Sequence, residues 1–139
     1  IPKQIIRQWL NKKNISGRRV LENEFQHFKY YPDLPGNNVL CGSWGTIRKH
    51  IRGNLVFKPN HKSSMFYDRF MKPWEHFIPV DPEFEELLQK YTWAEQHQLE
   101  SAKIAWRGFC IAEKYLKNID YYFIEASIEK IKPLNNEIF

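Results

Sequence analysis

Apolar residues along the chain gather in short clusters separated by turn-forming residues, and this pattern predicts strands that alternate with helices. A dense turn signal occupies residues 31–38, and Gly53 is expected to close a short helix over 46–52. Three short runs with β-like composition are the predicted strands, at residues 39–41, 55–57 and 76–80. Because strands alternate with helices, we expect an α/β fold with a short parallel sheet and a helical C-terminal tail.

Longer periodic segments predict the helices. A helix is expected over 18–28, and from Asp81 onward the chain should be helical, with Asp81 as the cap and Pro82 at the first helical position. A capping box that begins at Thr92 is expected to open the next helix, in which Gly108 is a kink or a tolerated weak point. The stripe that this helix should bury is Ala102, Ala105, Trp106, Phe109, Ala112 and Leu116. The last helix should bury Tyr121, Ile124, Ile128 and Ile131.

Length and composition describe one globular domain. The chain has 139 residues, enough for a single core, and 42% of them are hydrophobic, which excludes a disordered composition. No apolar run approaches the ~20 residues of a membrane span. We divide the chain into an N-terminal segment without an assigned role (1–38), a ligand-binding domain (39–132) and a tail (133–139). The first residue is Ile1 rather than Met, which suggests processing, an excised domain or a fragment.

The net charge of +5 is compatible with an anionic partner. The basic residues are scattered rather than gathered in a stripe, so we expect no nucleic-acid partner, although a basic nucleic-acid-binding domain stays the weakest alternative. Cys41 and Cys110 lack the spacing of a zinc site and are expected to be buried free thiols, with a disulfide as the alternative.

The segment around residues 39–57 is the first candidate site. Small residues follow the predicted strand and precede a helix, so backbone N–H groups are left open where a phosphate can bind. Trp44 can stack on a base or a sugar, and Arg48 can pair with a diphosphate. The alternative is an ordinary small-residue turn with Trp44 in the core. The candidate residues of this site are Cys41, Gly42, Ser43, Trp44, Gly45 and Arg48.

A second candidate, the segment 72–80, has an aromatic-rich run between two prolines. Glu75 and His76 are adjacent, and on a strand adjacent side chains face opposite ways, so we expect them to be poor partners for each other. We expect His76 to have a structural role with a satisfied ring nitrogen, and Trp74 to belong to the core.

An ordered set of motifs in this chain resembles the CAP10-type glycosyltransferases, which form glycosyltransferase family 90 and include protein O-glucosyltransferase-like enzymes. The set comprises Leu-Val-Phe at 55–57, the aromatic pair Phe66-Tyr67, Lys-Pro-Trp-Glu-His-Phe-Ile-Pro-Val at 72–80, and the run at 93–108 that begins Trp-Ala-Glu-Gln-His. The resemblance covers roughly residues 39–131.

The resemblance implies a Rossmann-like C-terminal half-domain of the GT-B type. It would use a UDP-sugar as donor substrate and a protein or glycan acceptor, without a bound metal or other cofactor. The family's phosphate-and-sugar turn falls on residues 39–45, with its serine at Ser43. The family's arginine falls on Gly45, so Arg48 would have to supply that charge. An acidic residue of the family falls on Met65, so Ser64 or Asp68 would have to replace it.

The resemblance assigns no catalytic residue to this chain, because the family's base is an Asp in the N-terminal half, which has no counterpart here. Two hypotheses follow: the donor-binding portion of a glycosyltransferase that transfers glucose or xylose, or a non-catalytic remnant of the same fold. The compartment stays unassigned; eukaryotic relatives work in the lumen of the endoplasmic reticulum or Golgi.

Overall fold

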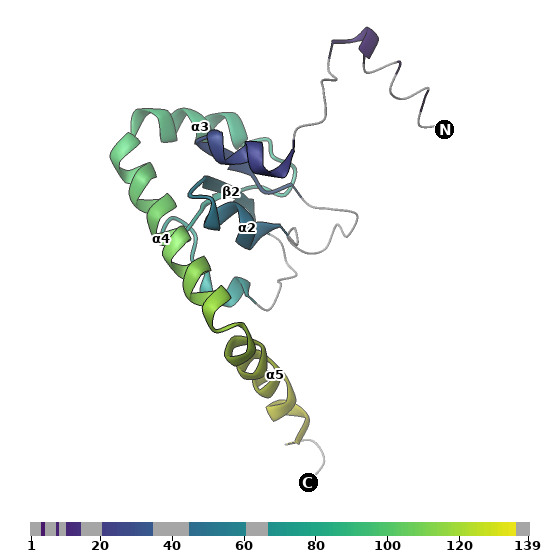
Figure 1. Ribbon diagram of the computed structural model, residues 1–139, viewed down its shortest axis with the longest axis vertical. Helices are drawn as coiled ribbons and strands as arrows, with labels where there is room; N and C mark the ends of the chain where they lie inside the picture. Colours follow the sequence, from purple (N-terminus) through teal and green to yellow (C-terminus); the bar gives the residue numbers. More distant parts are fainter. Residues whose placement is uncertain are drawn as a thin grey trace.

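The computed structural model describes residues 21–34, 45–60 and 67–135, together with positions 4, 8 and 11–14. In the described part, a three-stranded parallel sheet lies at the centre and helices pack around it (Figure 1). This mixed α/β architecture is the predicted one. The elements, with η for 3-10 helices, are η1 (Glu22–His27), β1 (Tyr30–Pro32), α2 (Thr46–Ile51), β2 (Leu55–Pro59), η2 (Asp68–Phe70), β3 (Ile78–Val80), α3 (Leu87–Gln96), α4 (Gln98–Lys117) and α5 (Ile119–Asn135).

The strand order is β1-β2-β3, and both pairs are parallel. Tyr30 is paired with Leu55, and Phe57 with Ile78. All five residues of β2 are buried, as expected for the central strand of a parallel sheet that is covered on both faces. The three carboxyl ends therefore meet at one edge of the sheet, which we call the carboxyl edge.

The first described strand was not predicted. Tyr30–Pro32 forms β1, so the expected turn over 31–38 is wrong at its start, and the predicted strand at 39–41 lies outside the described residues. Tyrosines favour strands. Pro32 is tolerated because β1 is an edge strand of the described sheet. The helix expected over 18–28 is, where it is described, the 3-10 helix η1.

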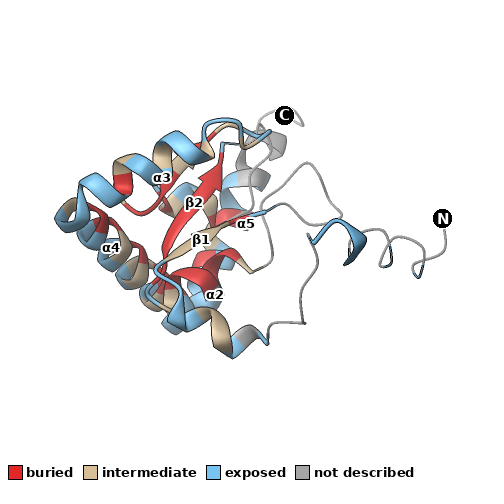
Figure 2. Ribbon diagram, turned by 90° about the horizontal axis from the view of Figure 1, so that it is seen from above, coloured by how far each residue is buried: buried red, intermediate tan, exposed pale blue. Residues whose placement is uncertain are grey.

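The core has two parts, one for each face of β2. Val56 packs with residues of α2, α4 and α5, including Ile47, Ala112 and Tyr122. Leu55 and Phe57 face the other side. They pack with residues of β3, α3 and the first half of α4, namely Ile78, Val80, Ala94 and Ile104. Figure 2 shows β2 buried between these layers.

The predicted buried stripe of α4 is confirmed at Ala112 and is displaced by one position elsewhere. The helix buries Ser101, Ile104, Gly108, Ala112 and Tyr115, whereas Trp106 is 64% exposed. The reason is steric, because small residues allow α4 to approach α2 and the turn before β3 closely. At Gly108, a Cβ atom would lie 2.5 Å from the carbonyl oxygen of His76 and 2.6 Å from Nδ1 of His50. Gly108 is thus a close-packing position rather than a kink.

Two helix starts also differ from prediction. Asp81 accepts hydrogen bonds from the backbone N–H groups of Glu85 (3.0 Å) and Glu86 (2.7 Å), but residues 82–86 form turns and α3 begins only at Leu87. Thr92 is not a cap. It lies inside α3, where its hydroxyl donates to the carbonyl of Leu88, because α3 continues to Gln96.

The last helix buries the opposite side from the predicted one. Tyr122 and Ala126 are buried, whereas the predicted stripe of Tyr121, Ile124, Ile128 and Ile131 is exposed. The aromatic ring of Tyr122 packs on Phe70 and Tyr115, with centroid distances of 4.4 and 5.7 Å, and this contact sets the helix rotation. Figure 1 shows α5 extending beyond the end of α4, away from the sheet.

Candidate functional site

The carboxyl edge of the sheet is where ligands bind in open α/β folds. Asp33 follows β1 there, Asn60 follows β2, and Asp81 follows β3. The helix α2 begins at this edge, since the side chain of its first residue, Thr46, contacts that of Asp33. The N-terminus of α2 therefore lies at the carboxyl edge.

Two of the six predicted donor-binding residues lie in the described structure. Gly45 is the N-cap of α2, and its carbonyl accepts a hydrogen bond from the backbone N–H of Lys49 (3.0 Å). Arg48 is exposed on the same helix. The other four, Cys41, Gly42, Ser43 and Trp44, lie outside the described residues.

A buried charged cluster that the sequence analysis missed supports the first turn of α2. The Asp33 side chain is fully buried; it accepts a hydrogen bond from the Thr46 hydroxyl and forms an ion pair with Lys49. The Lys49 ammonium also lies 4.9 Å from the centroid of the Tyr31 ring. Opposite charges and hydrogen bonds compensate the burial of these polar groups. The cluster therefore connects the end of β1 to the start of α2.

A second ion pair lies near the same edge. The Lys58 ammonium is 3.1 Å from a carboxylate oxygen of Asp68, and both side chains are largely buried. Tyr67 is also buried, which raises the pKa of its hydroxyl, and a hydrogen bond joins its side chain to that of Thr46. Ser64 and Met65 lie outside the described residues. Asp68 was the other possible substitute for the family's acidic residue. In the structure, its carboxylate neutralises the Lys58 ammonium.

His50 lies fully buried between α2 and α4. Within the described part of the chain, neither ring nitrogen has a hydrogen-bond partner. Burial, with smaller effects from His76, Lys58 and Lys49, lowers the pKa of the His50 imidazole to about 3. The ring is therefore neutral near pH 7 and acts as a packing group.

The structural role of His76 is confirmed, because its Nδ1 accepts a hydrogen bond from the backbone N–H of Lys72 (2.9 Å). The expectation that Glu75 and His76 do not interact is wrong. Their side chains lie 3.5 Å apart because both residues belong to a turn, not to a strand. Burial lowers the pKa of His76, and Glu75 partly opposes this shift.

Trp74 is 42% exposed and stands edge-on to Trp93, so its assignment to the core is wrong. Its backbone adopts a left-handed conformation (φ 64°), which directs the chain through the turn before β3. Cys110 carries an exposed free thiol rather than the buried one expected, while Cys41 lies outside the described residues.

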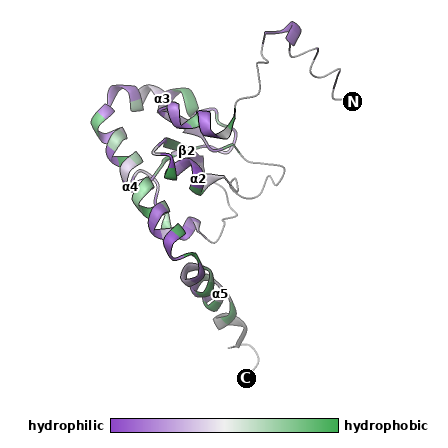
Figure 3. Ribbon diagram, viewed as in Figure 1, coloured by the Kyte–Doolittle hydropathy of each residue, from purple (hydrophilic) through white to green (hydrophobic). Residues whose placement is uncertain are grey.

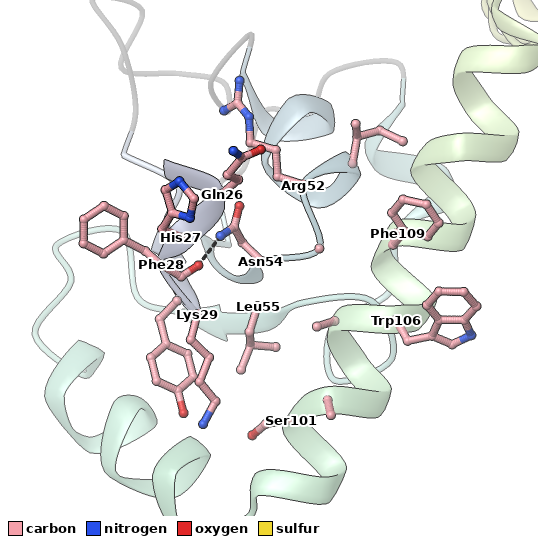
Figure 4. A pocket seen from close by; sticks show the side chains of 15 residues that line it. Gln26, His27, Phe28, Lys29, Arg52, Asn54, Leu55, Ser101, Trp106 and Phe109 are labelled. Atoms are coloured by element: carbon pink, nitrogen blue, oxygen red, sulfur yellow. Dashed lines mark hydrogen bonds between the residues drawn. The ribbon is translucent and has the colours of Figure 1, made fainter. Parts of the chain in front are cut away.

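A pocket of about 600 Å³ opens at the opposite edge of the sheet, where β1 and β2 begin (Figure 4). Its lining is mainly apolar and includes Phe28, Leu55, Trp106 and Phe109. The rings of Trp106 and Phe109 are stacked with centroids 5.4 Å apart. Of the two predicted donor-binding residues that the structure describes, neither Gly45 nor Arg48 lines it.

Among the described residues, no group of His, Cys, Asp and Glu has the arrangement of a metal site. No helix in that same part combines the length and apolarity needed to cross a membrane.

Comparison with known proteins supports the resemblance seen in the motifs. The model of the family described as "Glycosyl transferase family 90" matches residues 4–125. Protein O-glucosyltransferase 3 of Mus musculus is 34% identical over 109 residues, which are 76% of this chain and 21% of the mouse protein. Its Homo sapiens counterpart is 32% identical over the same shares. Protein O-glucosyltransferase 2 of Danio rerio is 36% identical over 66 residues, 45% of this chain and 13% of that protein. The chain thus spans at most about a fifth of these relatives.

Proposed function

Because this chain belongs to glycosyl transferase family 90, we propose that it is the donor-binding portion of a glycosyltransferase of the GT-B type. In this proposal, the full enzyme transfers glucose or xylose from a UDP-sugar to a hydroxyl of a protein or glycan acceptor. The observation that carries the proposal is the family match over residues 4–125, which includes the whole carboxyl edge of the sheet.

The geometry of the carboxyl edge supports a binding role. Gly45 is the N-cap of α2, and the buried cluster of Asp33, Thr46 and Lys49 stabilises the first turn of that helix. A binding site supported by buried contacts of this kind loses less conformational entropy when the ligand binds.

The proposed chemistry assigns a limited task to this chain. Transfer of the sugar leaves negative charge on the departing diphosphate, and N–H and guanidinium donors stabilise such charge. We assign this task to residues 41–45 and to Arg48. Lys49 is engaged with Asp33 and is therefore a supporting residue rather than a phosphate ligand. The base that activates the acceptor hydroxyl would come from a part of the enzyme that this chain does not contain.

Calorimetric titration with UDP tests the proposal, with ADP and an RNA oligomer as controls for selectivity. We expect UDP to bind selectively and Arg48→Ala to weaken binding by at least tenfold. Arg52→Ala is the matched control, because Arg52 follows the same helix but lines the pocket at the opposite edge. Equal UDP affinity for wild type and Arg48→Ala would refute the assignment of Arg48. A folded chain that binds no UDP would favour the non-catalytic remnant.

A further inference from the structure

The charged side chains described next to the strand ends at the carboxyl edge are engaged within the protein. Asp33, after β1, belongs to the buried cluster that supports α2. Asp81, after β3, accepts hydrogen bonds from two backbone N–H groups of the turn that follows it. Lys58, near the end of β2, is neutralised by Asp68. These groups therefore hold the edge of the sheet together.

Asn60 differs from these residues. It directly follows β2 and is exposed, and within the described part of the chain its side-chain amide makes no hydrogen bond. Its backbone is nevertheless fixed, because the Asn60 N–H donates to the carbonyl of Val80 (3.1 Å) and so continues the pairing of β2 with β3 by one residue. The amide is therefore presented to solvent from a well-anchored position.

The alternation of side chains along β2 places Asn60 on the side of the sheet that α2 covers. Asn60 follows the hydrophobic residues of β2 (Figure 3). Val56 packs with residues of α2, and Lys58 and Asn60 follow at intervals of two residues, so they belong to the same face. Asp33, whose N–H donates to the carbonyl of Phe57 (2.7 Å), also contacts α2 with its side chain. Asn60 thus lies at the end of the central strand, on the α2 side.

We propose that Asn60 is a specificity-determining residue for the donor sugar, whose hydroxyl groups its amide binds by hydrogen bonds. This inference rests on the proposed function and deepens it. Ligands of open α/β folds bind across the carboxyl ends of the strands, and β2 is the central strand of the described sheet. Arg48, the residue assigned to the diphosphate, belongs to the helix that covers the same side of the sheet.

The chemistry around Asn60 favours the sugar over the other parts of the donor. Phosphate is bound by cations and N–H groups, but Lys49 and Lys58 on this side already have carboxylate partners. A base is bound by stacking on aromatic rings, and none of the described residues that directly follow the strands is aromatic. The sugar is uncharged, and its hydroxyl groups both donate and accept hydrogen bonds, as the Asn60 amide does.

Calorimetric titrations with UDP and with UDP-glucose test the inference on wild type, Asn60→Ala and Asn23→Ala. Circular dichroism first establishes that all three are folded; Asn60→Ala removes an exposed side chain without hydrogen bonds and should leave the fold intact. We expect Asn60→Ala to weaken the binding of UDP-glucose about tenfold and to leave the affinity for UDP unchanged, because UDP lacks the sugar. Asn23→Ala makes the same change at an exposed residue of η1 and should bind both ligands like wild type.

Two results would overturn this inference alone, in a wild-type chain that binds UDP. Equal weakening of UDP and UDP-glucose by Asn60→Ala would assign Asn60 to the nucleotide rather than to the sugar. Unchanged affinity for both ligands would show that Asn60 contacts neither. A folded wild-type chain that binds neither UDP nor UDP-glucose would instead contradict the proposed function and, with it, this inference.

Discussion

Replacing Gly108 with alanine should destabilise the protein, although alanine is the better helix former. In an exposed helix interior, Gly→Ala stabilises by about 1 kcal/mol. Gly108, however, is buried in α4, and its new Cβ would lie 2.5 Å from the His76 carbonyl oxygen and 2.6 Å from the His50 ring. One neighbour is backbone and the other is a fully buried ring, so neither can move cheaply. Overpacking of this kind costs about 1–3 kcal/mol, which exceeds the gain in helix propensity.

Urea unfolding of wild type and Gly108→Ala, followed by circular dichroism, measures the difference in unfolding free energy. We expect a net loss of about 1 kcal/mol, which is the middle of the overpacking range less the gain in helix propensity, with an unchanged dependence on urea concentration. Ala102→Gly calibrates the propensity effect, because Ala102 is exposed on the same helix. A Gly108→Ala variant as stable as wild type, or more stable, would refute the close approach of α4 to α2.

Two further predictions concern buried charge. Asp33→Ala leaves the Lys49 ammonium buried without its counter-charge and should lower the free energy of unfolding, measured with urea, by roughly 3–5 kcal/mol. Adding Lys49→Met to this variant should restore most of the lost stability, because no unpaired charge then stays buried. Burial lowers the pKa of His50 from its ordinary 6.5 to about 3, so the fold favours the neutral ring. The contribution of His50 to the free energy of unfolding is fully present above pH 6.5 and decreases as the pH falls toward 3. Between pH 7 and pH 5 the free energy of unfolding should fall by about 2 kcal/mol. His50→Leu should lack this contribution, and identical pH profiles for the two proteins would contradict it.

Helices and strands were predicted correctly where the apolar pattern and the end signals of a segment agree with the way it packs. The helix before Gly53 and the strand that starts at Leu55 lie where they were expected, since each combines apolar residues with a clear end signal. Apart from Ala112, the stripe of α4 was displaced because hydrophobicity alone favoured Trp106, whereas close packing selected the small residues Ser101 and Gly108. In α5, the anchoring by Tyr122 determined which side is buried.

The candidate site was only partly predictable, because its supporting charges are far apart in sequence. Asp33 and Lys49 are separated by 16 residues, and nothing in the apolar pattern pairs them. The sequence did contain a weak signal. Asp33 is a carboxylate directly after a strand. Thr46 and Lys49 are three residues apart at the start of the next helix, so both side chains can face the same side of it. Burial of such a pair is costly unless both partners are present. The carboxyl edge therefore depends on Asp33 and Lys49 together, and this pair should be kept intact when Arg48 is tested as a ligand.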